Sequence, residues 1–571
     1  MTAPAGATRL ATAVEARLAG WADEGVADRL WAKDGSLWAV SGKTPDAVAA
    51  WLGWLDLPDA MRQRIPELER LAREVRDDGY TRAAVLGMGG SSLAPELFSR
   101  VVGDALGGAR SGSAGLELRI LDSTHPDAVR GFREWAESAR TIFCVSSKSG
   151  STTEPNAFHA AMSAHAPALD FIAITDPDTP LADLARSQGF RAIVEGPSDV
   201  GGRYSALSVF GLLPAALHGV DLGELLRRAA SMADACRRPS PQNPGLQLGA
   251  AMGEAALAGR DKLTILTSAR LASLGDWIEQ LVAESTGKAG RGIVPIVGEP
   301  LGAASSYGAD RQFLVVTLAG EDDPDATSVA HELEALGHPV QMLELADPFD
   351  IGAEFVRWEV ATAAAGMLLG IDPFDQPNVQ EAKDATKALL DAYRAQGALA
   401  QPVPLVAEPG IAAYADAAIL VDEPVTVEGA LRALLETAAP SDYFALLAYL
   451  PADPGTVEQL QRLRALVRDR AGLATSLGIG PRFLHSTGQL HKGGPPSGIF
   501  LQLTADPRRD LPIPGWPESF GILIAAQAAG DLAALQGRGR RVLRLHLADP
   551  EAGLARLEAM MHATLGEPAR A

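Results

Sequence analysis

Short apolar runs alternate with helical patterns along most of this chain of 571 residues, from about residue 81 onward. Runs of this length, bounded by turn residues and separated by segments with helical periodicity, predict parallel sheets with helices on both faces. In a first series the predicted strands are 83–86, 116–121, 141–145, 171–175 and 192–194. In a second series they are 263–266, 293–296, 313–317 and 340–343, and in a third region 443–450, 499–503 and 542–547. The predicted fold class is therefore α/β.

The chain before residue 81 has helical periodicity instead. Residues 8–33 have the pattern of an amphipathic helix, and residues 45–78 have that of further helical segments. Within the second stretch we expect Trp51, Trp54 and Leu55 to be core residues. An N-terminal helical segment is thus predicted to precede the sheets.

Two stretches rich in proline and polar residues, at 235–247 and 400–411, are candidate boundaries. The second series of strands opens with LTSARLASLGDW, which echoes VLGMGGSSLAPEL near the start of the first and hints at two related subdomains. The predicted units are an N-terminal helical segment at 1–80, a first α/β subdomain at 81–240, a second at 245–400 and a C-terminal α/β extension at 410–571.

Composition narrows the function classes. Hydrophobic residues make up 47% and charged residues 21%, as in ordinary globular enzymes, and the net charge of −21 disfavours a nucleic-acid partner bound through its phosphates. The N-terminus lacks the pattern of a signal peptide, and no run of about 18 apolar residues predicts a membrane span. The two cysteines, Cys144 and Cys236, have no metal-type spacing. We therefore expect a cytoplasmic protein that binds neither membrane nor nucleic acid.

Lysine is scarce, because only eight of the 50 basic residues are lysines. Where a chain prefers arginine so heavily, a lysine inside a Gly/Ser-rich stretch indicates a need for a compact ammonium group. Lysines in motif-like stretches are Lys148, Lys288, Lys383 and Lys492. For some of them a solvated surface position is an equal alternative.

Two loops rich in glycine and hydroxyl residues, 87–93 (GMGGSSL) and 145–156 (VSSKSGSTTEPN), each follow a predicted strand and precede a predicted helix. A helix N-terminus offers unpaired N–H groups and the positive end of its dipole, so hydroxyl residues there can cradle a phosphate. For either loop alone, a purely structural turn is the alternative. Two such loops about 60 residues apart predict one site for a phosphorylated metabolite.

A helical segment at 275–290 carries Gln280 and Glu284, which are four residues apart and therefore share one face. A carboxylate beside apolar residues near a glycine-terminated helix end is suited to act as a general base. The alternative is a solvated surface glutamate.

Two further segments add polar groups. In DVGGRYS, the glycines 201 and 202 let the backbone approach a ligand closely, and Arg203 could stabilise an anionic intermediate. In DPFDQPNVQEAK, Gln376 and Lys383 are two helical turns apart, so both can face one pocket. For DVGGRYS the alternative is a tight turn with a solvated arginine. For DPFDQPNVQEAK it is a capped surface helix.

In their order along the chain, these motifs resemble those of the glucose-6-phosphate isomerase (phosphoglucose isomerase) family of aldose–ketose isomerases. The resemblance spans roughly residues 80–390 and rests on GGSSLAPE, SSKSGSTTEPN, VGGRYS, Gln-x3-Glu-Ser-x-Gly-Lys and FDQPxV-x3-Lys. The chain is similar in particular to the isomerase portion of transaldolase–isomerase fusions, although no transaldolase barrel fits within it. It implies two SIS-type (sugar-isomerase) parallel-sheet subdomains flanked by helices, plus the C-terminal α/β extension.

The resemblance also implies a role for each candidate residue. The residues implied to bind the substrate are Gly90, Ser91, Ser147, Lys148, Ser149, Thr152, Gly202, Gln280 and Gln376, of which Ser147, Ser149 and Thr152 hold the phosphate. Glu284 matches the base that moves a proton between C1 and C2 through an enediol(ate), and Arg203 matches the group that stabilises the anion. Lys383 matches the lysine that helps to open the sugar ring. This chemistry requires no metal and no organic cofactor.

The sequence departs from the family at the histidine that opens the ring. The matching segment between the Glu and Lys motifs, 298–311, has no histidine and places Asp310 near the expected position. The histidines nearby, His331 and His338, have the pattern of structural residues.

A stretch resembling the histidine motif of some family members occurs late in the chain, at 483–498 (FLHSTGQLHKGGPPSG). We predict that the C-terminal extension returns this loop to the active site and that His485 opens the ring. His491 and Asp310 are the alternatives.

The predicted reaction is the interconversion of glucose 6-phosphate and fructose 6-phosphate. One alternative is an isomerase of broader specificity that also accepts mannose 6-phosphate, and another is a non-catalytic SIS-type sensor of a sugar phosphate. The resemblance implies a homodimer in which the neighbouring subunit completes the active site.

Overall fold

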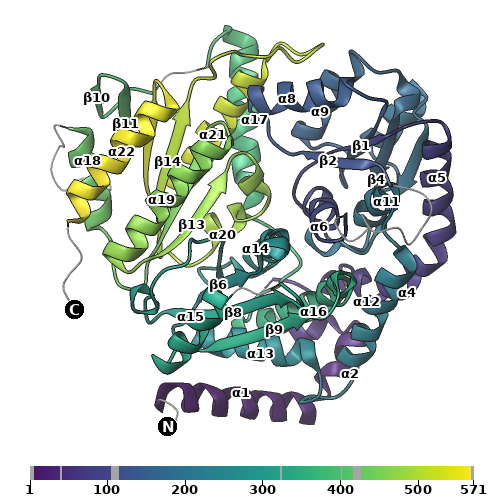
Figure 1. Cartoon of the computed structure of the whole chain (residues 1–571), viewed down its shortest axis with the longest axis vertical. Helices are drawn as coiled ribbons and strands as arrows, with labels where there is room; N and C mark the ends of the chain where they lie inside the picture. Colours follow the sequence, from purple (N-terminus) through teal and green to yellow (C-terminus); the bar gives the residue numbers. More distant parts are fainter. Residues whose placement is uncertain are drawn as a thin grey trace.

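The computed structural model describes residues 5–38, 42–103, 115–321, 324–399, 402–415 and 426–566. Three α/β units surround the middle of the molecule, with the first sheet at the right of Figure 1, the second at the bottom and the C-terminal one at the left. Helix α1 runs along the bottom edge beside the second unit. The fold class is the α/β architecture predicted from the strand pattern.

The N-terminal segment is helical, as its periodicity predicts. The predicted helix at 8–33 is divided at Gly25, which has a left-handed φ of 62°. The segment contains α1 (Ala5–Asp23), α2 (Val26–Trp31), α3 (Pro45–Ala49), α4 (Leu57–Ala60) and α5 (Ile65–Asp77). Trp54 and Leu55 are buried, but the prediction that Trp51 is a core residue is wrong. Trp51 is 39% exposed because its ring lines an open cavity instead of packing inward.

The first sheet has the strand order β2-β1-β3-β4-β5, and all neighbouring strands are parallel. Its strands are β1 (Arg82–Gly87), β2 (Glu117–Leu121), β3 (Thr141–Ser146), β4 (Phe171–Thr175) and β5 (Ala192–Glu195). Its helices include α6 (Leu93–Val101), α8 (Pro126–Glu137), α9 (Thr153–Ser163), α10 (Pro180–Gln188), α11 (Val209–His218) and α12 (Leu222–Cys236). The strands β1 and β3 are neighbours, so the loops that follow them lie side by side at one edge.

The second sheet has the order β7-β6-β8-β9 and is also parallel throughout. Its strands are β6 (Lys262–Thr267), β7 (Val294–Val297), β8 (Arg311–Leu318) and β9 (Val340–Leu345). The associated helices are α13 (Pro244–Leu257), α14 (Ala272–Thr286), α15 (Pro324–Ala335) and α16 (Ile351–Leu369).

The C-terminal sheet has the order β10-β11-β15-β14-β12-β13. The four parallel strands are β12 (Tyr443–Tyr449), β13 (Ala474–Ile479), β14 (Gly498–Ala505) and β15 (Arg541–Leu547). Strand β11 (Ile411–Ala415) pairs antiparallel with β15, and β10 (Val406–Glu408) pairs antiparallel with β11. The helices here are α17 (Val379–Gln396), α18 (Val427–Glu436), α19 (Pro454–Ala471), α20 (Gly488–Gly493), α21 (Phe520–Gly537) and α22 (Pro550–Leu565). The sequence did not predict β10, β11 or β13, which are short or interrupted by small polar residues.

All three sheets share one topology, because the first parallel strand of each unit lies between the second and the third. The sequence suggested that the first two subdomains are related, and the parallel strands of the C-terminal region follow the same order as theirs.

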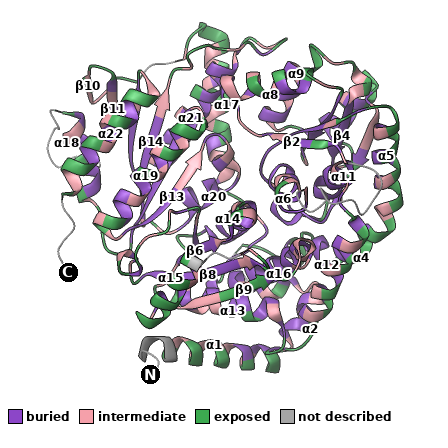
Figure 2. Ribbon diagram, in the orientation of Figure 1, coloured by how far each residue is buried: buried purple, intermediate pink, exposed green. Residues whose placement is uncertain are grey.

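Apolar contacts join the C-terminal region to the other units. One face of its sheet packs on α18, α19 and α22, and the other forms a core with α20, α21 and parts of α14 and β7. Helix α21 also shares a core with the first sheet and with Leu390 of α17. Figure 2 shows parts of these strands and helices as buried and other parts of the strands as intermediate. Among the described residues only α21 is long and apolar enough to cross a membrane, and 67% of it is buried inside the fold, as in a core helix.

Candidate active site

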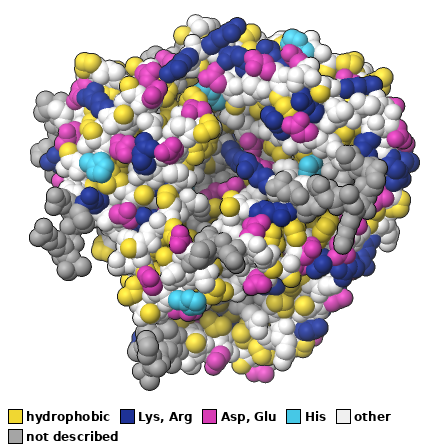
Figure 3. All heavy atoms as spheres, viewed as in Figure 1, with side chains coloured by type: hydrophobic (Ala, Val, Ile, Leu, Met, Phe, Trp, Pro, Cys, Tyr) yellow, Lys and Arg dark blue, Asp and Glu magenta, His cyan; other side chains and the backbone are white. Residues whose placement is uncertain are grey.

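The loops that follow β1 and β3 open into a cavity of about 470 Å³. Its volume lies within the range typical of small-molecule sites. Every predicted site residue lines it: Gly90, Ser91, Ser147, Lys148, Ser149, Thr152, Gly202, Arg203, Gln280, Glu284, Gln376, Lys383 and His485. These side chains come from all three α/β units, and the space-filling view has a hollow near its centre with charged side chains at the rim (Figure 3).

The hydroxyl-rich loop after β3 forms one wall of the cavity. Ser147 Oγ donates to Thr152 Oγ1 at 3.0 Å, and the loop ends where α9 begins, so the amides of a helix N-terminus are available to an anion here. Lys148 lines the same wall, but its ammonium is paired with Asp176 and donates to the Pro197 carbonyl at 2.9 Å. Hydroxyls and main-chain amides, with one already paired lysine, are therefore the groups that this wall offers to a phosphate.

The first loop is fitted closely against the VGGRYS segment. A Cβ atom at Gly90 would lie 1.9 Å from the carbonyl oxygen of Gly202, so only glycine allows this approach. The contact places the backbone of both loops on the cavity.

Arg203 is fixed by hydrogen bonds to two other segments and is only 1% exposed. Its Nε donates to Ser285 Oγ at 2.7 Å, and its Nη1 donates to Gln376 Oε1 at 2.6 Å. Its Nη2 donates to the Pro373 carbonyl at 2.6 Å. Nη1 lies 3.8 Å from Glu284 Oε2. A buried guanidinium held in this way is a preorganised cation beside the carboxylate.

Aromatic rings support this arginine from behind. Tyr204 stacks on Trp54 with 5.2 Å between ring centroids, and Phe374 lies 5.4 Å from Tyr204. Trp38 meets Phe374 edge-on at 4.9 Å. The N-terminal segment therefore buttresses the loops that carry Arg203 and Gln376.

Lys288 holds the loop at 372–376 in place. Its Nζ donates to the Asp372 carbonyl at 2.6 Å and to Asp375 Oδ1 at 2.8 Å. Burial, together with the nearby charge of Arg203, lowers the pKa of Lys288 to about 7 although Asp375 opposes the shift. This lysine of the Glu motif does not line the cavity and is best understood as a support for Gln376.

Gln280 and Glu284 face the cavity from α14. Gln280 Nε2 donates to the His485 carbonyl at 2.8 Å and lies 3.4 Å from Glu284 Oε2. Its Oε1 is buried and accepts no hydrogen bond from the residues that the structure describes. A ligand hydroxyl is a fitting donor for this atom.

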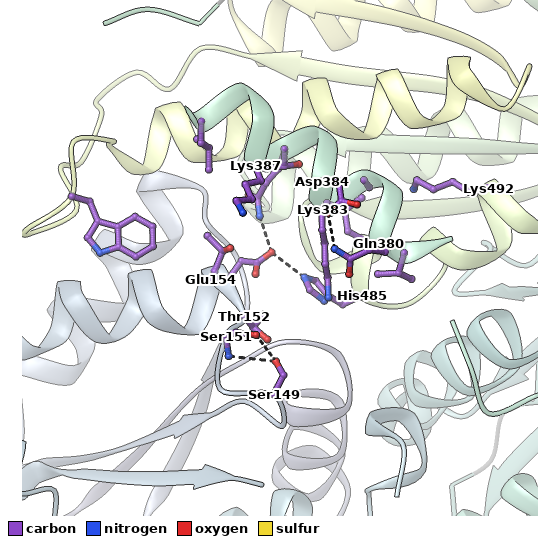
Figure 4. Close-up of a pocket in the computed structure, with 18 of the residues that line it drawn as sticks. Ser149, Ser151, Thr152, Glu154, Gln380, Lys383, Asp384, Lys387, His485 and Lys492 are labelled. Carbon is purple, nitrogen blue, oxygen red and sulfur yellow. Dashed lines mark hydrogen bonds and ion pairs between the residues drawn. The ribbon is translucent and has the colours of Figure 1, made fainter. Parts of the chain in front are cut away.

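His485 reaches the cavity from the short 3-10 helix η11 (Arg482–His485) of the C-terminal region. Its Nε2 donates to Glu154 Oε1 at 2.9 Å (Figure 4). Gln527 Nε2 donates to the same carboxylate oxygen at 2.7 Å, and Thr124 Oγ1 donates to Gln527 Oε1 at 2.7 Å. Burial opposes ionisation of Glu154, but the charge and hydrogen bond of His485 outweigh it and keep the pKa of this carboxyl below its usual value.

The two alternatives to His485 lie elsewhere. Asp310 is buried 3.2 Å from Lys262 Nζ, and His491 packs among rings that include Tyr443 and Phe500. Burial holds the pKa of His491 well below its ordinary value. Neither residue lines the cavity.

No model of a known protein family matches the chain. The glucose-6-phosphate isomerase of Carboxydothermus hydrogenoformans is 30% identical over 406 residues, which cover 59% of this chain and 85% of that protein. That of Rubrobacter xylanophilus is 30% identical over 394 residues, covering 60% and 90%. The chain belongs to the glucose-6-phosphate isomerase family.

Two solved structures show that the fold is shared. A hypothetical protein from Thermus thermophilus superposes with a TM-score of 0.54 at 24% identity, covering 65% of this chain and 98% of that one. A glucose-6-phosphate isomerase from Chlamydia trachomatis gives a TM-score of 0.51 at 18% identity, covering 64% and 78%. In each superposition, a substantial part of the present chain thus has no counterpart in the other structure.

Several residues of the site were not predicted from the sequence. Glu154 lies near the end of the second hydroxyl-rich stretch, in the first turn of α9, where an acidic residue is ordinarily ascribed to the helix dipole. Trp51 and Ser146 line the cavity, and the Ser146 hydroxyl has no partner within the described ranges. The one usable signal was position, because Ser146 and Glu154 belong to the SSKSGSTTEPN motif that carries the family resemblance. No group of three His, Cys, Asp or Glu residues that could hold a metal occurs in the described part of the chain.

Proposed function

We propose that the protein interconverts glucose 6-phosphate and fructose 6-phosphate, with Glu284 as the proton-shuttling base. One observation carries the proposal. A hydroxyl-rich helix start, a carboxylate and a buried guanidinium 3.8 Å from that carboxylate line a single cavity. These are the groups required by an isomerase that anchors a phosphate remotely and stabilises an enediolate.

The phosphate would bind to Ser147, Ser149 and Thr152, with Ser91 and the backbone of Gly90 beside it. Because the phosphate is remote from C1 and C2, the binding energy of the phosphate can serve to orient the reacting carbons. Gln280 and Gln376 would orient the sugar hydroxyls. The free Oε1 of Gln280 supports this assignment.

Ring opening is assigned to His485 and Lys383. The C1–O5 bond breaks, O5 gains a proton and the O1 hydroxyl loses one. We assign the donation to O5 to His485, whose ring is held by Glu154, and Lys383, which lines the same cavity, would assist.

Glu284 then removes the proton from C2 of the open aldose and returns it to C1, while the proton of the C2 hydroxyl passes to O1. Negative charge develops on O1 in the enediolate, and the guanidinium of Arg203 is already oriented to stabilise it. The same steps in reverse convert the ketose to the aldose.

The direct test couples glucose 6-phosphate formation from fructose 6-phosphate to its oxidation by a dehydrogenase. The wild-type protein and the surface control Glu69→Gln should turn over, and Glu284→Gln should lose turnover while it still binds a sugar phosphate. A sensor would show no turnover in any of the three. Parallel assays with mannose 6-phosphate decide whether the specificity is broader.

We further propose a homodimer in the cytoplasm, as the resemblance implies. All the candidate catalytic side chains nevertheless come from one chain, because His485 reaches the cavity within the same polypeptide. Specific activity should therefore stay constant on dilution through any dimer–monomer transition followed by sedimentation velocity. Loss of activity in step with dissociation would mean that a second subunit supplies part of the site.

A further inference from the structure

A second cavity of about 390 Å³ adjoins the active-site cavity, and we refer to it as the annex. The residues that line both cavities are Ser149, Thr152, Val379, Lys383 and His485. The annex lies between the start of α9, the exposed face of α17 and the C-terminal region (Figure 4). The proposed chemistry uses Glu154, Lys383 and His485 where the two cavities meet, but not Ser151, Thr153 or Lys387.

Two lysines that form no ion pair in the described part of the chain line the annex. All eight lysines lie within the described ranges, and six of them form an ion pair with an aspartate: Lys33, Lys43, Lys148, Lys262, Lys288 and Lys492. For the other two, Lys383 and Lys387, no carboxylate lies within 4.0 Å among the residues described. Both line the annex from α17, four residues apart and therefore on one face of the helix.

The acids at the annex compensate this charge only in part, because Glu154 feels the charge of Lys383 but forms no ion pair with it. Glu154 is occupied by His485 and Gln527, and Asp384 accepts from Gln380 Nε2 at 2.7 Å. Among the eight lysines of this chain with a net charge of −21, Lys383 and Lys387 are the two that form no ion pair with a described residue.

The opposite wall supplies neutral donors and an apolar surface. Ser151 and Thr153 line it at the start of α9, an eleven-residue helix, so hydroxyls and the positive end of the dipole face the lysines. Leu390, Leu484 and Trp516 form an apolar side. An anionic group with a small organic body matches these surroundings.

We propose that the annex binds a phosphate group, held between Lys387 and Lys383 and the hydroxyls of Ser151 and Thr153. The inference deepens the proposed function, because it rests on the adjoining cavity being the sugar-phosphate site. The phosphate belongs either to a hexose bisphosphate that spans both cavities or to a separate phosphorylated metabolite that binds beside the substrate.

The test is calorimetric titration of the intact protein with inorganic phosphate after saturation with sorbitol 6-phosphate, a ligand that cannot isomerise. The proposal predicts that phosphate binds as a second ligand. Lys387→Gln should weaken that binding by at least about threefold, the loss expected when one exposed cation is removed. Lys387→Arg should retain most of it, and Lys33→Gln, at a paired lysine, should match the wild type.

Fructose 1,6-bisphosphate separates the two sources. If it displaces sorbitol 6-phosphate and binds at least about threefold more weakly to Lys387→Gln, the annex takes the second phosphate of one ligand. If only inorganic phosphate depends on Lys387, a separate metabolite is the occupant.

Equal binding of both probes to Lys387→Gln and Lys33→Gln would overturn the proposal. So would the absence of a second phosphate in the saturated wild-type protein together with bisphosphate binding that does not depend on Lys387. A protein without isomerase activity that still binds phosphate beside sorbitol 6-phosphate would refute the proposed function and leave the annex standing.

Discussion

Replacing Glu154 with glutamine tests whether the contact between the first and C-terminal units has a chemical role. The carboxylate is 5% exposed and accepts hydrogen bonds from His485 at 2.9 Å and from Gln527 at 2.7 Å. Glutamine keeps the shape and removes the charge. Hydrogen bonds to charged groups contribute about 1.5–3 kcal/mol, so we expect kcat/KM on cyclic glucose 6-phosphate to fall by about 10- to 150-fold.

The loss should be confined to ring opening. Erythrose 4-phosphate cannot close a ring through its phosphorylated O4, so its isomerisation needs Glu284 and Arg203 but no ring-opening group. We expect Glu154→Gln and His485→Ala to retain at least about half of the wild-type rate on this tetrose, far more than on the hexose, because general acid–base assistance is lost only where it is used. Coupled assays on both sugars give the two ratios.

An exposed α8 residue, Glu137, provides the control, because Glu137→Gln removes a charge without touching the cavity. Equal losses of Glu154→Gln on hexose and tetrose would refute the ring-opening role and point to general disruption of the site. Thermal unfolding of each variant shows whether the fold is retained.

Three further predictions concern the cavity wall, the loop contact and stability. Trp51→Ala should raise KM by about five- to tenfold with little change in kcat, because an indole at the cavity mouth contributes contact to the bound sugar; an unchanged KM would contradict this. Gly90→Ala should lower kcat/KM by about 100-fold, because its Cβ would lie 1.9 Å from the Gly202 carbonyl oxygen, whereas Gly131→Ala, with nothing within 4 Å, should be near wild type. Burial, with Asp276 adding to it, raises the pKa of Glu279 from 4.5 to about 8, so the folded state binds the extra proton and stability falls as pH rises through this window. In urea unfolding, the free energy of unfolding of Glu279→Gln should fall less between pH 5 and pH 8 than that of the wild type, by up to about 3 kcal/mol. If it falls equally in the two proteins, Glu279 is ionised in the folded state.

Much of the fold could be predicted because its signals are local. Buried parallel strands produce continuous apolar runs, and a strand followed by small residues and a helix start is visible in a few consecutive positions. Strand β13 was missed because ATSLGI mixes small and polar residues, and its place beside β12 depends on tertiary pairing.

The candidate site could be predicted only where its residues sit in such local motifs. Glu154 and His485 are separated by 331 residues, so their hydrogen bond depends on how the C-terminal region docks. Trp51 has the same amphipathic pattern as the buried Trp54, and no feature of the sequence distinguishes a core ring from one at a cavity mouth. The single-chain origin of the cavity likewise follows from docking.

The most direct test of the central claim is incorporation of solvent deuterium into the sugar phosphate. In D₂O, the wild-type protein should exchange the C2 proton of glucose 6-phosphate during isomerisation, as followed by NMR, because Glu284 shares its proton with the solvent. Glu284→Gln should bind the sugar phosphate and leave C2 fully protonated, with turnover lower by at least about a thousandfold. Deuterium at C2 of the substrate incubated with Glu284→Gln, at the wild-type rate, would show that another group carries the proton.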